Sequence, residues 1–242
     1  MIEVFILSIF QGITEFIPVS SSSHLIIVSK YLNFNNQNLT IDLSLHVGSF
    51  FAVIIYFRRD LLNFIENKKL LLRIVLASIP TMVVGFVLVK FELIQYLRDP
   101  KIIAWTTIIF GILLFFSDKF KNENVIDENL TLKSAIFIGL FQILSLVPGV
   151  SRSGITITAA RFLKFKRVDA AKISFLLSIP TLAAITIFMF LSLYKNNDFN
   201  FSSLNLLAVL LSYIFSYLTI NYFLKYLKDF NFNIFVIYRI AI

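Results

Sequence analysis

Long uncharged apolar runs are the feature that most limits how this chain can fold. Residues 173–194 and 204–224 carry no charge, and each is close to the roughly 20 apolar residues that a helix needs to cross about 30 Å of hydrocarbon. Three shorter runs cover residues 43–57, 74–89 and 102–117. Flanking basic side chains that reach the membrane surface can extend them. The pattern predicts an all-α polytopic membrane protein with about six transmembrane helices.

The composition excludes several classes of function. Apolar residues make up 58% and charged residues 15% of the chain, whereas a soluble domain has about 25% charged residues. The net charge of +8 would otherwise suggest nucleic acid, but the basic residues lie between apolar runs, where they orient the chain in a membrane. We therefore expect no nucleic-acid partner. The absence of cysteine excludes disulfides, thiolate catalysis and Cys-ligated metals.

Two further apolar regions are each interrupted by a proline and a cluster of small hydroxyl residues. The first covers residues 4–32, with the interruption at residues 18–24, and the second covers residues 134–163, with the interruption at residues 148–154. At 1.5 Å per residue each arm rises only about 20 Å, which is too short to span the bilayer. Both regions predict re-entrant helix-break-helix hairpins that turn back near mid-membrane.

Short repeats occur in these segments. Phe-Gln at residues 10–11 lies seven residues before Pro-Val-Ser, and Phe-Gln at residues 141–142 lies seven residues before Gly-Val-Ser. This is a weak internal repeat. A second repeat, Ser-Ile-Pro-Thr, occurs at residues 78–81 and 178–181. The two Ser-Ile-Pro-Thr copies are closer together in sequence than the two Phe-Gln copies, by about the length of one helix. The repeats therefore do not define a single boundary between two halves of the chain.

Charge placement predicts the orientation in the membrane. If each hairpin returns to the side it entered and residues 58–73 are cytoplasmic, fifteen Lys and Arg lie inside and six, including Arg239, lie outside. This distribution follows the positive-inside rule. Three spans separate the hairpins, so they enter from opposite sides. We expect one membrane domain, residues 1–242, with approximate halves 1–120 and 130–242 forming inverted repeats that meet at the midplane.

Ionisable residues inside the apolar regions are functional candidates, because placing them there is costly. Glu15, His24 and Arg152 fall at the two interruptions, where backbone amides also lack helical partners. Arg152 is the strongest candidate, since an arginine at this depth has few structural explanations. His46, in the middle of an expected span, is interpreted as an interhelical hydrogen bonder.

Each interruption also supplies the amino end of a helix. Pro18 ends one arm and Ser20 is suited to cap the next, so the first amides of that arm would point into the break. Ser151 would begin the opposing helix in the same way. Two helix amino ends facing one point form a site for an anion. The candidate donors are Ser20, Ser21, Ser22, Ser23, Ser151, Arg152 and Ser153.

The side chains at these breaks suit phosphoryl transfer. Arg152 favours a phosphate, because a guanidinium makes bidentate contacts with oxyanions. Glu15 makes a divalent cation reasonable, since Mg²⁺ is typically held by one or two carboxylates and substrate phosphate oxygens. Ser21 and His24 are three residues apart and share a helix face, so the imidazole could serve as general base. Spacing leaves open which of the two attacks phosphorus.

Two motifs carry a family resemblance. Residues 10–24, FQGITEFIPVSSSSH, and residues 148–156, PGVSRSGIT, closely resemble the signature motifs of the undecaprenyl-diphosphatase family of bacitracin-resistance membrane phosphatases. The resemblance extends over nearly the whole chain, including Tyr238 and Arg239. It implies hydrolysis of undecaprenyl diphosphate to undecaprenyl phosphate and inorganic phosphate in cell-wall lipid-carrier recycling, with Mg²⁺ or Ca²⁺, at the outer face of the bacterial inner membrane.

The resemblance also implies roles for individual positions. The expected catalytic residues are Glu15, Ser21, His24 and Arg152, with Glu15 also the metal ligand. Expected substrate contacts come from Gln11, Ser20, Ser22, Ser151, Ser153 and Thr156. Gln11 stands where some members have a second glutamate, and Ser23 stands where many have glycine. A two-carboxylate metal site is therefore not expected here.

A transporter or flippase for an anionic lipid or solute is the alternative hypothesis, because secondary carriers also build sites from inverted repeats with broken helices. A carrier needs the anion site but has no use for a serine and a histidine on one helix face. The expected partners are a polyprenyl diphosphate and the bilayer, and the sequence permits an oligomer.

Overall fold

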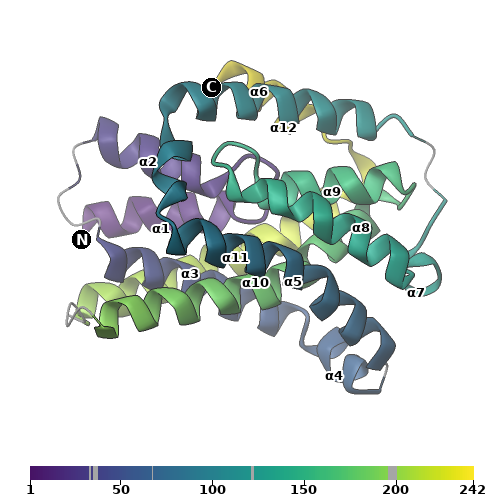
Figure 1. Ribbon diagram of the computed structural model, residues 1–242, viewed down its shortest axis with the longest axis horizontal. Helices are drawn as coiled ribbons and strands as arrows, with labels where there is room; N and C mark the ends of the chain where they lie inside the picture. The colour runs from purple at the N-terminus through teal and green to yellow at the C-terminus, as the bar shows by residue number, and fades with distance from the viewer. Residues whose placement is uncertain (33, 35–37, 67, 121–122, 196–200) are drawn as a thin grey trace.

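A computed structural model describes the chain except residues 33, 35–37, 67, 121–122 and 196–200, and its described elements are helices (Figure 1). The α-helices are α1 (Ile2–Thr14), α2 (Ser21–Tyr31), α3 (Leu39–Tyr56), α4 (Arg58–Glu66), α5 (Lys68–Lys90), α6 (Pro100–Ser117), α7 (Ile126–Asn129), α8 (Leu132–Gln142), α9 (Arg152–Phe162), α10 (Arg167–Lys195), α11 (Ser203–Asp229) and α12 (Asn233–Ala241). Two 3₁₀ helices, η1 (Leu93–Arg98) and η2 (Ile143–Leu146), complete the set.

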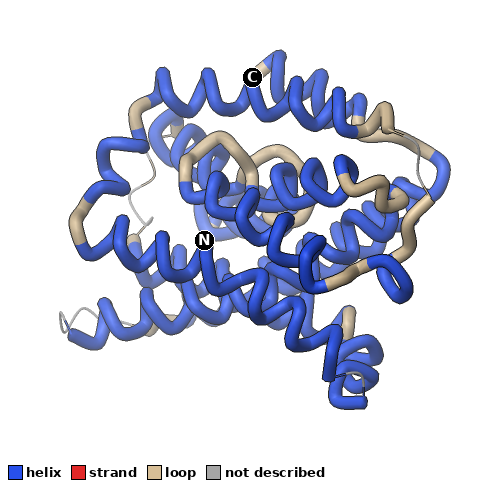
Figure 2. The backbone as a smooth tube through the Cα atoms, turned by 45° about the vertical axis from the view of Figure 1, so that its right-hand side comes forward, coloured by secondary structure: helices blue, strands red, loops and turns tan. Residues whose placement is uncertain are grey.

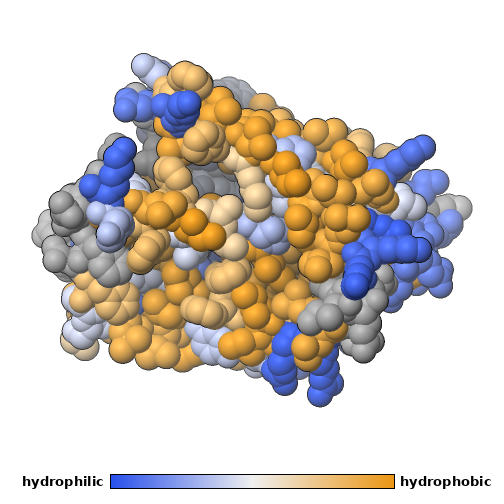
Figure 3. All heavy atoms as spheres, turned by 60° about the horizontal axis from the view of Figure 1, so that its bottom comes forward, coloured by the Kyte–Doolittle hydropathy of each residue, from blue (hydrophilic) through white to orange (hydrophobic). Residues whose placement is uncertain are grey.

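Five of the described helices, α3, α5, α6, α10 and α11, are long and apolar enough to cross a membrane. They coincide with the five runs that the sequence predicted as spans. No sixth helix of this kind occurs in the described part of the chain, and α12 has only nine residues. Large apolar side chains such as Trp105 and Ile187 are exposed on these helices, and apolar residues cover most of the face shown in Figure 3, with hydrophilic ones toward its margins. The chain is an all-α polytopic membrane protein, as predicted.

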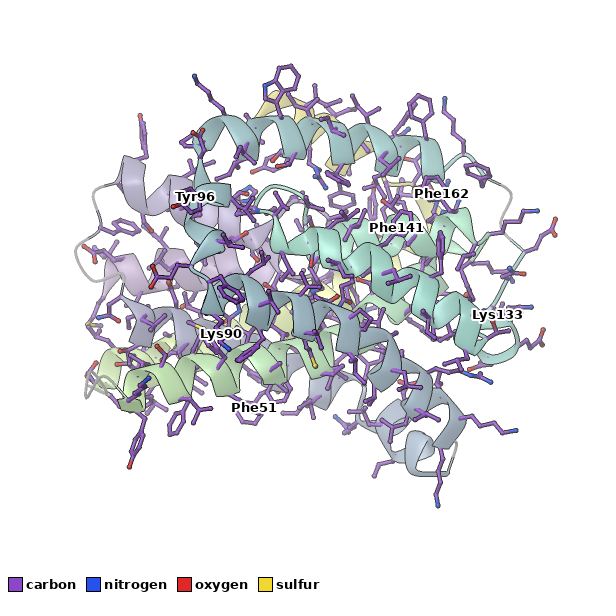
Figure 4. The ribbon with its side chains drawn as sticks, in the orientation of Figure 1. Phe51, Lys90, Tyr96, Lys133, Phe141 and Phe162 are labelled. Carbon is purple, nitrogen blue, oxygen red and sulfur yellow. The ribbon has the colours of Figure 1, made fainter. Side chains whose placement is uncertain are left out.

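Both interrupted regions fold as helix-break-helix hairpins, which confirms that prediction. Helices α1 and α2 have 13 and 11 residues, and helices α8 and α9 have 11 each. Loops of both hairpins lie toward the middle of the molecule (Figure 2). Phe141 of α8 packs against Phe162 of α9 with ring centroids 6.4 Å apart, whereas Lys133 at the start of α8 points outward (Figure 4). The division into inverted halves stays a prediction.

The two breaks share an unusual backbone conformation. Ser20, before α2, has φ of 77°, and Ser151, before α9, has φ of 71°. Non-glycine residues rarely adopt this left-handed region, which is typically found where the surroundings impose it. Gly149 also has φ of +92°, and a Cβ there would collide with the Thr106 hydroxyl and the Ile103 carbonyl of α6. Helix α6 therefore packs directly against the second break.

Helix α10 contributes the most residues to the hydrophobic core, and α3 and α11 pack closely against each other. Small residues allow α3 and α11 to approach closely, as in other membrane helix pairs: Ser49 Oγ lies 3.1 Å from Ser212 Oγ and 2.9 Å from Ser216 Oγ. Phe16, in the first break, is fully buried and packs edge-to-face on Phe175 of α10, with centroids 5.3 Å apart. Because Phe16 directly follows Glu15, this contact holds the backbone of the first break in place beside Glu15.

Candidate active site

The two breaks border a common polar cavity of about 230 Å³. Helices α3, α5 and α10 complete its walls. The lining residues are Glu15, Ser20, Ser21, Ser22, His46, Thr81, Ser145, Leu146, Ser151, Arg152, Thr181, Leu182 and Ile185. The structure thus brings Glu15, Ser21 and Arg152 together at one cavity, although more than 130 residues separate the two breaks.

Glu15 and Arg152 form an ion pair that joins the two hairpins. Arg152 Nη2 lies 2.7 Å from Glu15 Oε1, and the two side chains are only 14% and 7% exposed. Arg152 Nη1 also donates to the Ser174 carbonyl of α10 at 3.1 Å. Removing one partner from a buried pair leaves the other charge uncompensated. The two groups therefore orient each other at the cavity wall.

The second oxygen of Glu15 is held by two neutral donors. Glu15 Oε2 accepts from Ser21 Oγ at 2.8 Å and from Gln11 Nε2 at 3.0 Å. Gln11 Nε2 also lies 3.3 Å from His46 Nδ1, so this ring nitrogen is the acceptor because the amide is a donor. A serine hydroxyl that donates to a carboxylate already has a proton acceptor within reach.

His24 is not in this cavity, and the predicted pairing of Ser21 with His24 is wrong. His24 Nδ1 lies 2.7 Å from the Ser20 carbonyl, and Nε2 lies 2.6 Å from the Tyr238 hydroxyl. Its ring also stacks with Phe10 and Tyr238. These residues line a second, mostly apolar cavity of about 320 Å³ between α1 and α12. The three-residue spacing is compatible with a shared helix face, but Tyr238 turns the ring toward α12.

The helix amino ends at the cavity differ in their caps. Ser20 makes no side-chain cap, contrary to expectation, and its hydroxyl lies 3.0 Å from Ser23 Oγ. Ser151 does act as a cap, because its hydroxyl accepts from the Gly154 amide at 3.2 Å. The first amides of an uncapped helix need another acceptor. The start of α2, where Ser20 and Ser22 line the cavity, therefore suits an external anion.

Two predicted substrate contacts have structural partners instead. Ser153 Oγ donates to the Ile17 carbonyl at 2.8 Å, which links the second break to the first. Thr156 Oγ1 lies 2.7 Å from Ser174 Oγ on α10 and is fully buried. Neither residue lines the cavity. Gln11 is fully buried as well and reaches the site through Glu15.

Sequence reasoning missed several residues of the cavity wall. His46 makes the interhelical hydrogen bond that was expected of it, but it also lines the cavity. Thr81 and Thr181 are the last residues of the two Ser-Ile-Pro-Thr copies. Each directly follows the proline inside its helix, α5 or α10. Both threonines line the cavity, so this repeat was the signal that could have identified them.

The oxygen atoms around Glu15 provide few ligands for a divalent cation. Gln11 Oε1 is buried and has no hydrogen-bond partner in the described structure, so one amide oxygen is free beside one carboxylate. The described residues contain no group of three His, Cys, Asp or Glu side chains that could hold a metal. The residues therefore fit a cation that takes most of its ligands from water and a phosphate group, as Mg²⁺ commonly does.

Together, the fold and the site define an integral membrane protein whose two interrupted hairpins border a cavity lined by carboxylate, hydroxyl and guanidinium groups. The chain belongs to the bacitracin resistance protein BacA family, whose model matches residues 4–242. It is 50% identical over 243 residues to an undecaprenyl-diphosphatase of Pelagibacter ubique (strain HTCC1062), covering 100% of this chain and 94% of that protein. It is 41% identical over 248 residues to an undecaprenyl-diphosphatase of Saccharophagus degradans, covering 98% and 93%. The resemblance seen in the motifs is confirmed.

Proposed function

We propose that this protein is an undecaprenyl-diphosphate phosphatase, which hydrolyses undecaprenyl diphosphate to undecaprenyl phosphate and inorganic phosphate. Full-length similarity to two undecaprenyl-diphosphatases supports this activity. The observation that carries the chemistry is the convergence of Glu15, Ser21 and Arg152 at one cavity beside the start of α2. Such a site combines a nucleophile, a proton acceptor and donors for phosphate oxygens.

In the proposed reaction, Ser21 is the nucleophile and Glu15 replaces His24 as its base. Ser21 Oγ attacks the terminal phosphorus while its proton passes to Glu15 Oε2, 2.8 Å away. The bond from phosphorus to the bridging oxygen breaks, and the leaving polyprenyl phosphate takes the proton from Glu15. Water then attacks the phosphoserine, and Glu15 transfers the proton of that water to Ser21 Oγ as inorganic phosphate leaves. Arg152 and the amides at the start of α2 stabilise charge on the phosphoryl oxygens.

A divalent cation, Mg²⁺ or Ca²⁺, is part of this proposal. Glu15, the carboxylate that lines the cavity, would hold it, with the remaining ligands coming from water and phosphate oxygens. When bound, such an ion neutralises negative charge on phosphate oxygens. Phosphate release should accordingly stop when EDTA is added and return when Mg²⁺ or Ca²⁺ is supplied in excess.

The proposed location is the bacterial inner membrane, with the cavity accessible from the outer side. The positive-inside distribution of Lys and Arg supports this orientation. The diphosphate would lie at the cavity and the prenyl chain among the lipid tails. A transporter of an anionic lipid is not favoured, since the relatives carry the name of a phosphatase and transport alone gives no role to a serine that donates to a carboxylate.

Phosphate release by the purified protein in detergent tests the activity. We expect wild-type protein to release inorganic phosphate from undecaprenyl diphosphate, and Ser21→Ala to lower kcat by about 10³-fold, because the nucleophile is lost. Ser23→Ala is the matched control, because Ser23 is buried against Ser20 and does not line the cavity. Its kcat should stay close to that of wild type.

Two results would contradict the proposal at different levels. An inactive but folded wild-type protein, with the cation present, would exclude the phosphatase activity. A Ser21→Ala protein with wild-type kcat would leave the activity in place but remove Ser21 as nucleophile, and water would then be the attacking group.

A further inference from the structure

Arg239 of α12 is almost completely buried, with 1% of its surface exposed. The charge distribution placed it among residues outside the membrane, but the structure places it against the two breaks. In the described part of the chain, its hydrogen bonds go to main-chain carbonyls, and it forms no ion pair with a carboxylate. The family chemistry proposed above gives this arginine no role.

The guanidinium of Arg239 joins three segments that are distant in sequence. Nε donates to the Thr107 carbonyl of α6 at 3.0 Å. Nη1 donates to the Pro18 carbonyl of the first break at 3.3 Å. Nη2 donates to the carbonyls of Gly149 and Val150 in the second break, at 2.8 and 3.1 Å. One rigid planar group therefore contacts both breaks at once.

These contacts satisfy groups that would otherwise be costly in an apolar environment. A buried guanidinium needs acceptors, and the carbonyls of an interrupted helix need donors, because no water is present in the bilayer core. Here the guanidinium supplies the donors and the carbonyls supply the acceptors. The geometry is specific, since a guanidinium presents its donors in a fixed fork.

The contacts also orient an amide of the proposed anion site. In a trans peptide the C=O and the following N–H point in opposite directions. Because Arg239 holds the Val150 carbonyl, the Ser151 amide points away from Arg239, and Ser151 lines the cavity. The adjacent Tyr238 holds His24, which in turn contacts the Ser20 carbonyl. Helix α12 thus contacts the residue before Ser151 directly and reaches Ser20 through His24.

We propose that Arg239 is a positioning residue, which holds the two breaks at a fixed separation and so sets the oxyanion donors of the cavity. It does not touch the substrate. Its effect on turnover rests on the proposed phosphatase function, but its effect on the breaks does not. The two effects are therefore tested separately.

The separation of the breaks can be measured with paired spin labels, because the chain has no cysteine. The label sites are Ile13→Cys beside the first break and Leu144→Cys beside the second, which are 38% and 40% exposed. We expect a narrow distance distribution in the otherwise wild-type protein and a broader or shifted one in Arg239→Gln. Ile237→Ala, at a residue of α12 that is 67% exposed, should leave the distribution unchanged. An unchanged distribution in Arg239→Gln would overturn the proposal.

Kinetics provide the second readout. We expect Arg239→Gln to lower kcat per folded protein by about 100-fold with little change in KM, because small displacements of donors chiefly affect the transition state. Arg239→Lys keeps the positive charge but not the planar guanidinium geometry, and should recover part of kcat. If the Gln variant does not fold, the Lys variant provides the test in its place. Wild-type kcat in both variants would refute the proposal. An inactive wild type would refute the proposed function instead, and the label distances would still decide the role of Arg239.

Discussion

At the scale of single residues, Glu15 is the centre of the site. Arg152 contacts one of its carboxylate oxygens, and Ser21 and Gln11 contact the other. The carboxylate therefore has a fixed orientation toward the serine hydroxyl before any substrate binds. Preorganisation of this kind reduces the reorganisation that is needed during reaction.

His46 should affect turnover through Gln11. His46→Leu removes one of the two acceptors of the Gln11 amide group, and a buried N–H left without a partner costs about 1–3 kcal/mol. We expect kcat for phosphate release to fall about tenfold, the equivalent of about 1.4 kcal/mol. His46→Asn places an acceptor near the former Nδ1 position and should restore most of that loss. Equal activity of the Leu and Asn variants would show that the hydrogen bond to Gln11 is not what matters.

Some residues of the site could be predicted from the sequence and others could not, for physical reasons. Glu15 and Arg152 were identifiable because charges within apolar segments are rare and costly. The environment of His24 was not, because its ring orientation depends on Tyr238, which is 214 residues away. Arg239 lies in a short helix, and no local pattern indicates that its partners are carbonyls of two distant breaks.

At the scale of elements, the breaks are the functional parts of the fold. Length and proline placement were enough to predict both hairpins, since arms of 11 to 13 residues cannot cross a bilayer. The walls supplied by α5 and α10 were not predicted, although each carries Ser-Ile-Pro-Thr. The repeat shows that two segments are alike, but only packing shows that both threonines face one cavity.

Gly149→Ala should damage the second break. The residue has φ of +92°, and a Cβ would collide with the Thr106 hydroxyl and the Ile103 carbonyl. We expect a Tm several degrees lower, since strain at such a position costs about 1–3 kcal/mol, together with reduced phosphate release. Gly85→Ala is the stability control, because its Cβ would meet only the flexible end of Leu146, at 3.3 Å. A wild-type Tm and turnover for Gly149→Ala would show that the break tolerates the added atom.

At the scale of the whole molecule, the described residues form five long helices, two hairpins whose arms are too short to cross a bilayer, and several short helices. The lengths of the apolar runs and the composition were sufficient for this level, because the bilayer allows few alternatives to spanning helices. The direction of insertion is a separate property, which depends on the charged ends of the helices rather than on their packing.

Labelling from one side of the membrane tests the orientation. Lys69→Cys lies at the start of α5 and Lys101→Cys at the start of α6, and both positions are exposed. With the basic segment 58–73 inside, an impermeant maleimide should label Lys101→Cys in intact spheroplasts and Lys69→Cys only after permeabilisation. The cysteine-free parent is the blank. The reverse pattern would invert the topology and place the cavity on the other side.

The ion pair between Glu15 and Arg152 has a consequence for selectivity. With no ligand bound, the pair has no net charge, so a small monovalent anion such as chloride gains little by separating it. A diphosphate carries several negative charges, so its oxygens can replace the Glu15 carboxylate as the partner of Arg152. We therefore expect monovalent anions such as chloride to bind the resting site weakly, without any separate element that excludes them.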